Sequence, residues 1–127
     1  MLNLDHIAAK VAQEMVKKAG TPKELDILVT KTLGVLQENG IYACVLFLDS
    51  RGDREKEMAK QIREQLEQAL KEAGLYQPKP NNNLREWITD NLASQLDQLL
   101  LVKQLWEQTL IYARYGAKAA ASAESSK

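Results

Sequence analysis

The first part of the chain repeats apolar residues at intervals of three and four, which is the period of one helix face. The repeat runs over residues 4–19. Asn3 precedes it at the position of a helix N-cap, and Gly20 follows it where a left-handed residue closes a helix. This pattern predicts a first amphipathic helix, whose inward face consists of Leu4, Ile7, Ala8, Val11, Ala12, Met15 and Ala19.

A second helix is predicted to begin at the segment "TPKE". Thr21 takes the N-cap position, Pro22 fits the first turn, and Glu24 completes a capping box with the threonine. The residues "ILVT" inside this segment favour strands, but the difference in strand propensity amounts to only ~1 kcal/mol. The pair Asn39-Gly40 then ends the helix.

The eight residues from Ile41 to Leu48 contain no charge. A strand here would need a partner for its backbone N–H and C=O groups, and the other strand-like segment is already assigned to a helix. We therefore expect a short helix that is apolar on every side because it is buried on every side. A strand is the alternative.

The rest of the chain predicts three further helices. Residues 53–73 are mostly charged around a narrow apolar stripe, which is typical of a surface helix. The segment "YQPKPNNN" marks a loop, placed at residues 75–83. Asn83 and Glu86 begin the next helix, and residues 91–95 are the expected break before the last one. The inward pattern across this region includes Leu84, Trp87, Ile88, Leu92, Leu96, Leu99, Leu100, Leu105, Trp106 and Leu110.

Together these elements predict an all-α fold, a compact single-domain bundle of five to six helices with a buried central helix. A chain of 127 residues suits a single core of ordinary size. We place the helical domain at residues 1–119. Residues 120–127 have no large apolar side chain and are predicted to form a disordered C-terminal tail.

Composition limits the possible partners and compartment. Lys plus Arg and Asp plus Glu both number 17, so a neutral chain can bind nucleic acid or anionic lipid only through a local patch. The longest apolar run is far shorter than the ~20 residues of a membrane-spanning helix, and the first residues do not resemble a signal peptide. The single cysteine, Cys44, suits a reducing compartment. We expect a cytoplasmic protein.

The titratable residues do not suggest catalysis. His6 is the sole histidine and falls on the polar side of the first helix. Cys44 has no polar neighbour in sequence that would lower the pKa of its thiol. The acids of residues 53–73 alternate with Lys and Arg, which is typical of a solvated, ion-paired face. We expect no enzyme, no metal site and no cofactor.

Surface chemistry leaves two kinds of candidate site. Basic residues occur along the first helix and in "IYARYGAK", where tyrosines alternate with them, and such a mixture can hold a phosphate backbone and stack on bases. The alternative is that the tyrosines are core residues and the basic side chains are solvated. The tryptophans suit either a core or the centre of a protein interface. The RNA-binding candidates are Lys10, Lys17, Lys18, Arg114 and Lys118, and the protein-interface candidates are Trp87 and Trp106.

Three stretches of the sequence carry a family resemblance: "VTKTLGVLQENGIYACVLFL", "LREWI" and "LWEQTLIYARYGAKA". They are similar to the small all-helical subunit of the type III-B CRISPR effector complex (Cmr-type, RAMP module), with a likeness over residues 4–119. The resemblance implies a non-catalytic subunit in antiviral defence. Such a subunit stacks head to tail beside the large polymerase-cyclase-like subunit and helps to hold guide and target RNA. A helical protein-interaction adaptor without a nucleic-acid role is the alternative.

Overall fold

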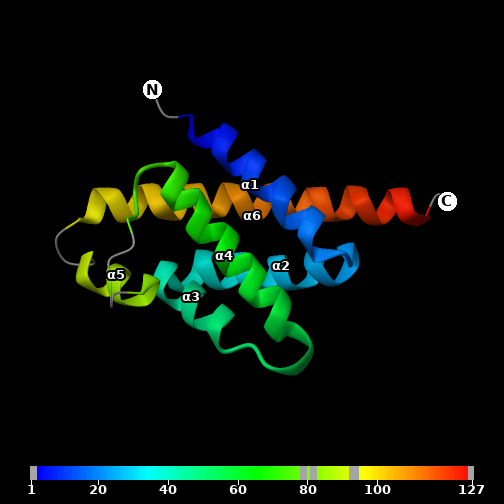
Figure 1. Ribbon diagram of the computed structural model, residues 1–127, viewed down its shortest axis with the longest axis horizontal. Coiled ribbons are helices and arrows are strands. Elements are labelled where there is room, and N and C mark those ends of the chain that lie inside the picture. The colour runs from blue at the N-terminus through cyan, green and yellow to red at the C-terminus, as the bar shows by residue number, and fades with distance from the viewer. Residues whose placement is uncertain (1–2, 78–79, 81–82, 92–94, 126–127) are drawn as a thin grey trace.

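A computed structural model of the protein describes residues 3–77, 80, 83–91 and 95–125. Within these residues the chain forms six α-helices, one short 3-10 helix and no strand, so the predicted all-α fold is confirmed (Figure 1). The helices are α1 (Leu4–Ala19), α2 (Pro22–Asn39), α3 (Ile41–Asp49), the 3-10 helix η1 (Asp53–Glu55), α4 (Lys56–Glu72), α5 (Leu84–Asn91) and α6 (Leu96–Ser125).

The longest helix, α6, organises the molecule and runs along its long axis (Figure 1). Its 30 residues span about 45 Å at the rise of an α-helix. Helices α1 and α2 both pack along α6, and α4 lies against α1 and α3. The short α5 packs on α3 at the end of the molecule where α6 begins.

Local signals in the sequence set the ends of α1 and α5 as predicted. The Asn3 side chain accepts a hydrogen bond from the His6 backbone N–H at 3.0 Å. Gly20 closes α1 with a left-handed φ of 72°, which an L side chain adopts only with strain. Asn83 caps α5 in the same way as Asn3 caps α1, by accepting from the Glu86 N–H at 2.9 Å.

The predicted capping box of α2 is wrong. Pro22 does occupy the first turn of α2, but the Thr21 side chain makes no capping hydrogen bond. Its hydroxyl donates instead to the Ala19 carbonyl oxygen at 3.5 Å. The two-residue connection between α1 and α2 places Thr21 next to the free carbonyl groups that end α1, and these compete for the hydroxyl proton.

The uncharged segment is a helix, α3, as predicted, but it is not buried on every side. Tyr42 and Leu46 are 38% and 37% exposed. Helices α2, α4 and α5 cover α3, and no described residue covers its remaining side, where these two side chains lie. Its buried residues are Ile41, Cys44, Val45 and Leu48.

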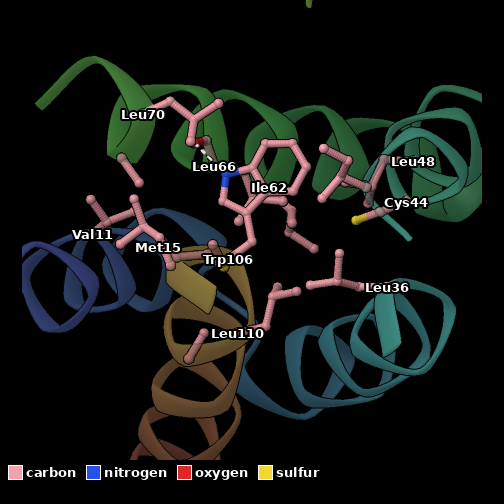
Figure 2. Packing of buried hydrophobic residues seen from close by; sticks show 14 of the residues in the cluster. Val11, Met15, Leu36, Cys44, Leu48, Ile62, Leu66, Leu70, Trp106 and Leu110 are labelled. Atoms are coloured by element: carbon pink, nitrogen blue, oxygen red, sulfur yellow. Dashed lines mark hydrogen bonds between the residues drawn. The ribbon is translucent and has the colours of Figure 1, made fainter. Parts of the chain in front are cut away.

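The centre of the core is Trp106 on α6. This side chain is fully buried, and its indole N–H donates to the Leu66 carbonyl oxygen of α4 at 3.0 Å (Figure 2). Side chains from α1, α2, α3 and α4 converge around it, so one apolar cluster joins the helices. The labelled members of this cluster are Val11, Met15, Leu36, Cys44, Leu48, Ile62, Leu66, Leu70, Trp106 and Leu110.

The remaining predictions concern the connections and the ends. The predicted loop falls between α4 and α5, and the predicted break falls between α5 and α6. The described part of the chain leaves out residues 78–79, 81–82 and 92–94 of these two connections. The expected inward position Leu92 is therefore outside the described residues. Helix α6 continues to Ser125, because an alanine-rich segment has high helix propensity. The domain boundary at residue 119 and disorder beyond it stay predictions.

Candidate functional site

The cations proposed to contact RNA lie on two packed helices. Lys10, Lys17 and Lys18 are on α1, and Arg114 and Lys118 are on α6. The last turn of α1, the first turn of α2 and the second half of α6 lie together, towards the end of the molecule opposite α5 (Figure 1). The structure therefore brings four of these five residues to one end, and Lys10 lies apart from them in the middle of α1.

Three of the five cations form ion pairs within the chain. Side chains of Lys10, Lys17 and Lys118 are 49–73% exposed, so each pair contributes only ~0–1 kcal/mol and a phosphate can compete for the cation. Their partners also separate them, since Lys10 points to α4 and Lys118 points to α2. The pairs are Lys10–Glu72 at 3.0 Å, Lys17–Glu14 at 3.8 Å and Lys118–Asp26 at 3.2 Å.

Lys18 and Arg114 form no ion pair with the described residues. Lys18 is exposed, and no ion pair joins it to the described residues. Arg114 is half-buried, and its Nε atom is buried without a hydrogen-bond partner in the described part of the chain.

The two tyrosines of the last helix differ in how accessible their rings are to a bound base. The Tyr112 hydroxyl donates to the Asp5 carboxylate, and this hydrogen bond raises the pKa of Tyr112 above its ordinary value. The Tyr115 side chain is 64% exposed. Neither tyrosine is a fully buried core residue, and Tyr115 is the one whose ring is open to stacking.

An apolar groove, which the sequence did not predict, runs between α1 and α6. It has a volume of about 470 Å³ and is lined by Ala9, Ala12, Gln13, Val16, Lys17, Tyr112 and Gly116. Close approach of the two helices depends on Gly116, because a Cβ atom there would lie 3.1 Å from the Val16 Cγ2 atom. Small residues on both helices are the sequence signal that points to such an approach.

The two tryptophans lie in different environments in the structure. Trp106 is fully buried, so its assignment to a protein interface is wrong: its indole fills the core of this chain. Trp87 is half-buried on α5, and its ring meets that of Tyr76 edge to face at a centroid distance of 5.1 Å. A role for Trp87 in a protein interface stays a prediction.

A second charged region, also not predicted, lies where α5 and α6 meet. Glu86 and Asp90 on α5 and Asp97 on α6 are exposed, and no ion pair joins them to the described residues. Leu96 and Leu100 beside them are 65% and 55% exposed, which corrects their predicted inward orientation. The inward face of α6 passes instead through Leu99 and Val102, because α5 is too short to cover the other side of its first turns.

The described part of the chain offers neither a metal-binding group nor a reactive thiol. No three His, Cys, Asp or Glu side chains in it lie close enough together to hold a metal ion. Burial raises the pKa of the Cys44 thiol to about 12, so the nucleophilic thiolate is strongly disfavoured. None of the helices in this part is long and apolar enough to span a membrane.

Comparison with known proteins identifies the family. The family model described as CRISPR-associated protein (Cas_Cmr5) matches residues 4–120, which is most of the chain and includes all six helices in whole or in large part. No curated protein and no solved structure gives a significant match. The chain therefore belongs to the Cas_Cmr5 family, the small subunits of the type III-B CRISPR Cmr complex.

Proposed function

We propose that this protein is a non-catalytic structural subunit of an RNA-guided type III-B CRISPR ribonucleoprotein, in which copies stack head to tail and help to hold the guide–target RNA. Its partners in this proposal are the other subunits, including the large polymerase-cyclase-like subunit, and its compartment is the cytoplasm. Membership of the Cas_Cmr5 family is the observation that carries the proposal. The buried Cys44 thiol, which is inert as a nucleophile, supports a role without catalysis.

The proposed contact with RNA rests on the basic residues of α6. Arg114 is half-buried and forms no ion pair with the described residues, and the Lys118 ammonium group pairs with the partly buried carboxylate of Asp26. Tyr115 adds an open aromatic ring on the same helix. Because the chain has no net charge, we expect the isolated subunit to bind RNA weakly and the assembled complex to bind it well.

The experiment measures target-RNA affinity of the reconstituted complex as a function of salt. The variant Arg114→Gln/Lys118→Gln should bind RNA more weakly, and the salt dependence of its affinity should be shallower. Each lost phosphate contact removes ~0.7–0.9 from the slope of log K against log salt. The matched control is Lys56→Gln/Lys60→Gln, two exposed lysines on α4 that have no ion pair within the described residues. Equal affinities for all three complexes would contradict the RNA contact.

The alternative, a helical adaptor without a nucleic-acid role, is favoured by the exposed apolar residues of α3. Tyr42 and Leu46 occupy the uncovered side of this helix, and α5, which carries Trp87, packs beside it. A pull-down from the native host that recovers one protein partner and no RNA would favour this adaptor over the ribonucleoprotein subunit.

A further inference from the structure

Among the exposed charges that no ion pair joins to the described residues, one group of acids and one group of lysines lie towards opposite ends of the molecule, and others lie along α4. We define the acidic end as Glu86, Asp90, Leu96, Asp97 and Leu100, all exposed, on α5 and the start of α6. Its nearest cation along the chain, Arg85, is already paired with Asp49 at 3.4 Å. The three carboxylates of this end are therefore not compensated within the described part of the chain.

The opposite end carries the complementary charge. We define the basic end as Lys17, Lys18, Lys23 and Ile27, all exposed, on the last turn of α1 and the start of α2. Glu24, an exposed acid beside Lys23, reduces the positive charge of this end but does not cancel it. Lys17 has one long ion pair at 3.8 Å, and no ion pair joins Lys18 or Lys23 to the described residues. Figure 1 shows that this end and the acidic end are at opposite sides of the molecule.

Each end also presents apolar surface beside its charges. Leu96 and Leu100 are one helical turn apart on α6, and they are among the most exposed large apolar residues of the chain. At the basic end, Ile27 is 56% exposed and follows Lys23 by one turn of α2. Ile27, Leu28 and Met58 form the apolar part of a pocket of about 180 Å³, which Glu24, Arg54 and Glu55 also line, and this apolar part can receive a leucine side chain.

We propose that the acidic end of one copy docks on the basic end of the next, with Leu96 and Leu100 against the Ile27 pocket and the three carboxylates facing Lys17, Lys18 and Lys23. This inference rests on the proposed function and names the surfaces through which copies stack. The neutral chain fits this arrangement, because each copy supplies one end of either sign. Since the two contacting surfaces differ, the contact repeats along a line of copies instead of closing into a symmetric pair.

The inference divides the basic residues between two partners. Lys17 and Lys18 contact the neighbouring copy, so that only the last copy of a line exposes them. Arg114 and Lys118 on α6 remain for RNA. Attraction between the ends falls as salt rises, because exposed opposite charges are screened.

The experiment exchanges the charges of the two ends and measures the average mass in solution by analytical ultracentrifugation. Variant one carries Lys17→Glu, Lys18→Glu and Lys23→Glu, and variant two carries Glu86→Lys, Asp90→Lys and Asp97→Lys. Each variant alone should associate about tenfold more weakly than the unchanged chain. An equimolar mixture of the two should associate again, because every contact then joins opposite charges.

Three controls keep the result interpretable. Lys60→Glu reverses an exposed lysine of α4 that belongs to neither end and does not line the Ile27 pocket, and this variant should associate like the unchanged chain. Leu100→Ser should weaken association at every salt concentration, because it removes apolar contact only. Circular dichroism identifies a reversed variant that does not fold, and the neutral set Glu86→Gln/Asp90→Asn/Asp97→Asn then replaces variant two.

Two outcomes would overturn the inference. One is an unchanged chain that stays monomeric at about 1 mM and low salt, where even a contact worth ~4 kcal/mol would populate pairs. The other is a mixture of reversed variants that stays monomeric while variant one lowers RNA binding of the complex, which would assign the basic end to RNA. The proposed function fails separately, if the chain associates with itself but does not co-purify with other CRISPR subunits.

Discussion

At the scale of single residues, Trp106 combines full burial with a hydrogen bond that joins two helices. The indole N–H of Trp106 and the Leu66 carbonyl oxygen satisfy each other between α6 and α4. Aromatic side chains at such a position both fill volume and fix the orientation of two helices. The core therefore depends on one specific hydrogen bond in addition to apolar packing.

Trp106→Phe should lower the free energy of unfolding by about 2–4 kcal/mol, because it leaves a cavity and removes the indole hydrogen bond to the Leu66 carbonyl group. Urea unfolding followed by circular dichroism measures this loss. Trp87→Phe is the matched control. That side chain is half-buried, and its indole N–H makes no hydrogen bond with the described residues, so its loss should be less than half as large. Equal losses at both positions would contradict the central role of Trp106.

Cys44 gives a prediction for pH. Its thiol pKa is raised from 9.0 to about 12 by burial, so the folded chain keeps the proton at pH values where the unfolded chain releases it. The stabilising effect is complete below pH 9 and is lost as the pH rises from about 9 to about 12. From pH 8 to pH 10 the free energy of unfolding should fall by about 1.4 kcal/mol more in the unchanged chain than in Cys44→Ala.

Urea unfolding at both pH values provides the comparison, and other titrating groups cancel between the two chains. Reaction of the thiol with an aromatic disulfide reagent gives an independent check, since folded protein at pH 8 should react far more slowly than protein in urea. Parallel pH curves for the two chains would show that Cys44 is accessible.

At the scale of helices, the contact between α1 and α6 depends on the absence of a side chain at Gly116. A Cβ atom there would come within 3.1 Å of Val16 Cγ2, and a β-branched side chain in a helix has few other rotamers to adopt. Gly34, in the interior of α2, has no atom within 4 Å of its Cβ position. Gly116 therefore lies in a tight contact between two helices, whereas Gly34 has free space at its Cβ position.

Gly34→Ala should raise the free energy of unfolding by about 0.5–1 kcal/mol, because alanine is the better helix former. Gly116→Ala should gain less or lose stability, since crowding at Val16 offsets the same gain in propensity. Thermal melting of both variants tests the difference. If Gly116→Ala is stabilised as much as Gly34→Ala, the approach of α1 to α6 does not depend on the missing side chain at Gly116.

At the scale of the whole molecule, the apolar cluster includes residues up to Ala117 of α6. The last turns, from residue 120 to residue 124, contain no buried residue. A stop codon after Ala119 should therefore change the free energy of unfolding by less than about 0.5 kcal/mol, and amides beyond it should exchange their hydrogens rapidly. Slow exchange or a clear loss of stability would place these residues within the folded domain.

The sequence by itself determined the helices. Apolar spacing, Asn3, Gly20, Pro22 and Asn83 set the elements and most of their ends, because these signals act within a few residues. The uncharged segment from Ile41 to Leu48 was predicted to be a helix because the sequence offered no partner for a strand. The family also followed from such local patterns together with the overall order of elements.

Only the tertiary structure decided which side of each helix meets another helix. Leu96, Leu100, Tyr42 and Leu46 fit an inward pattern and are exposed, because the neighbouring helices end before they cover these positions. Trp106 and Trp87 have the same side chain, and packing alone made one the centre of the core. The placement of one group of free acids and one group of free lysines towards opposite ends likewise depends on how six helices are arranged in space, which no local pattern encodes.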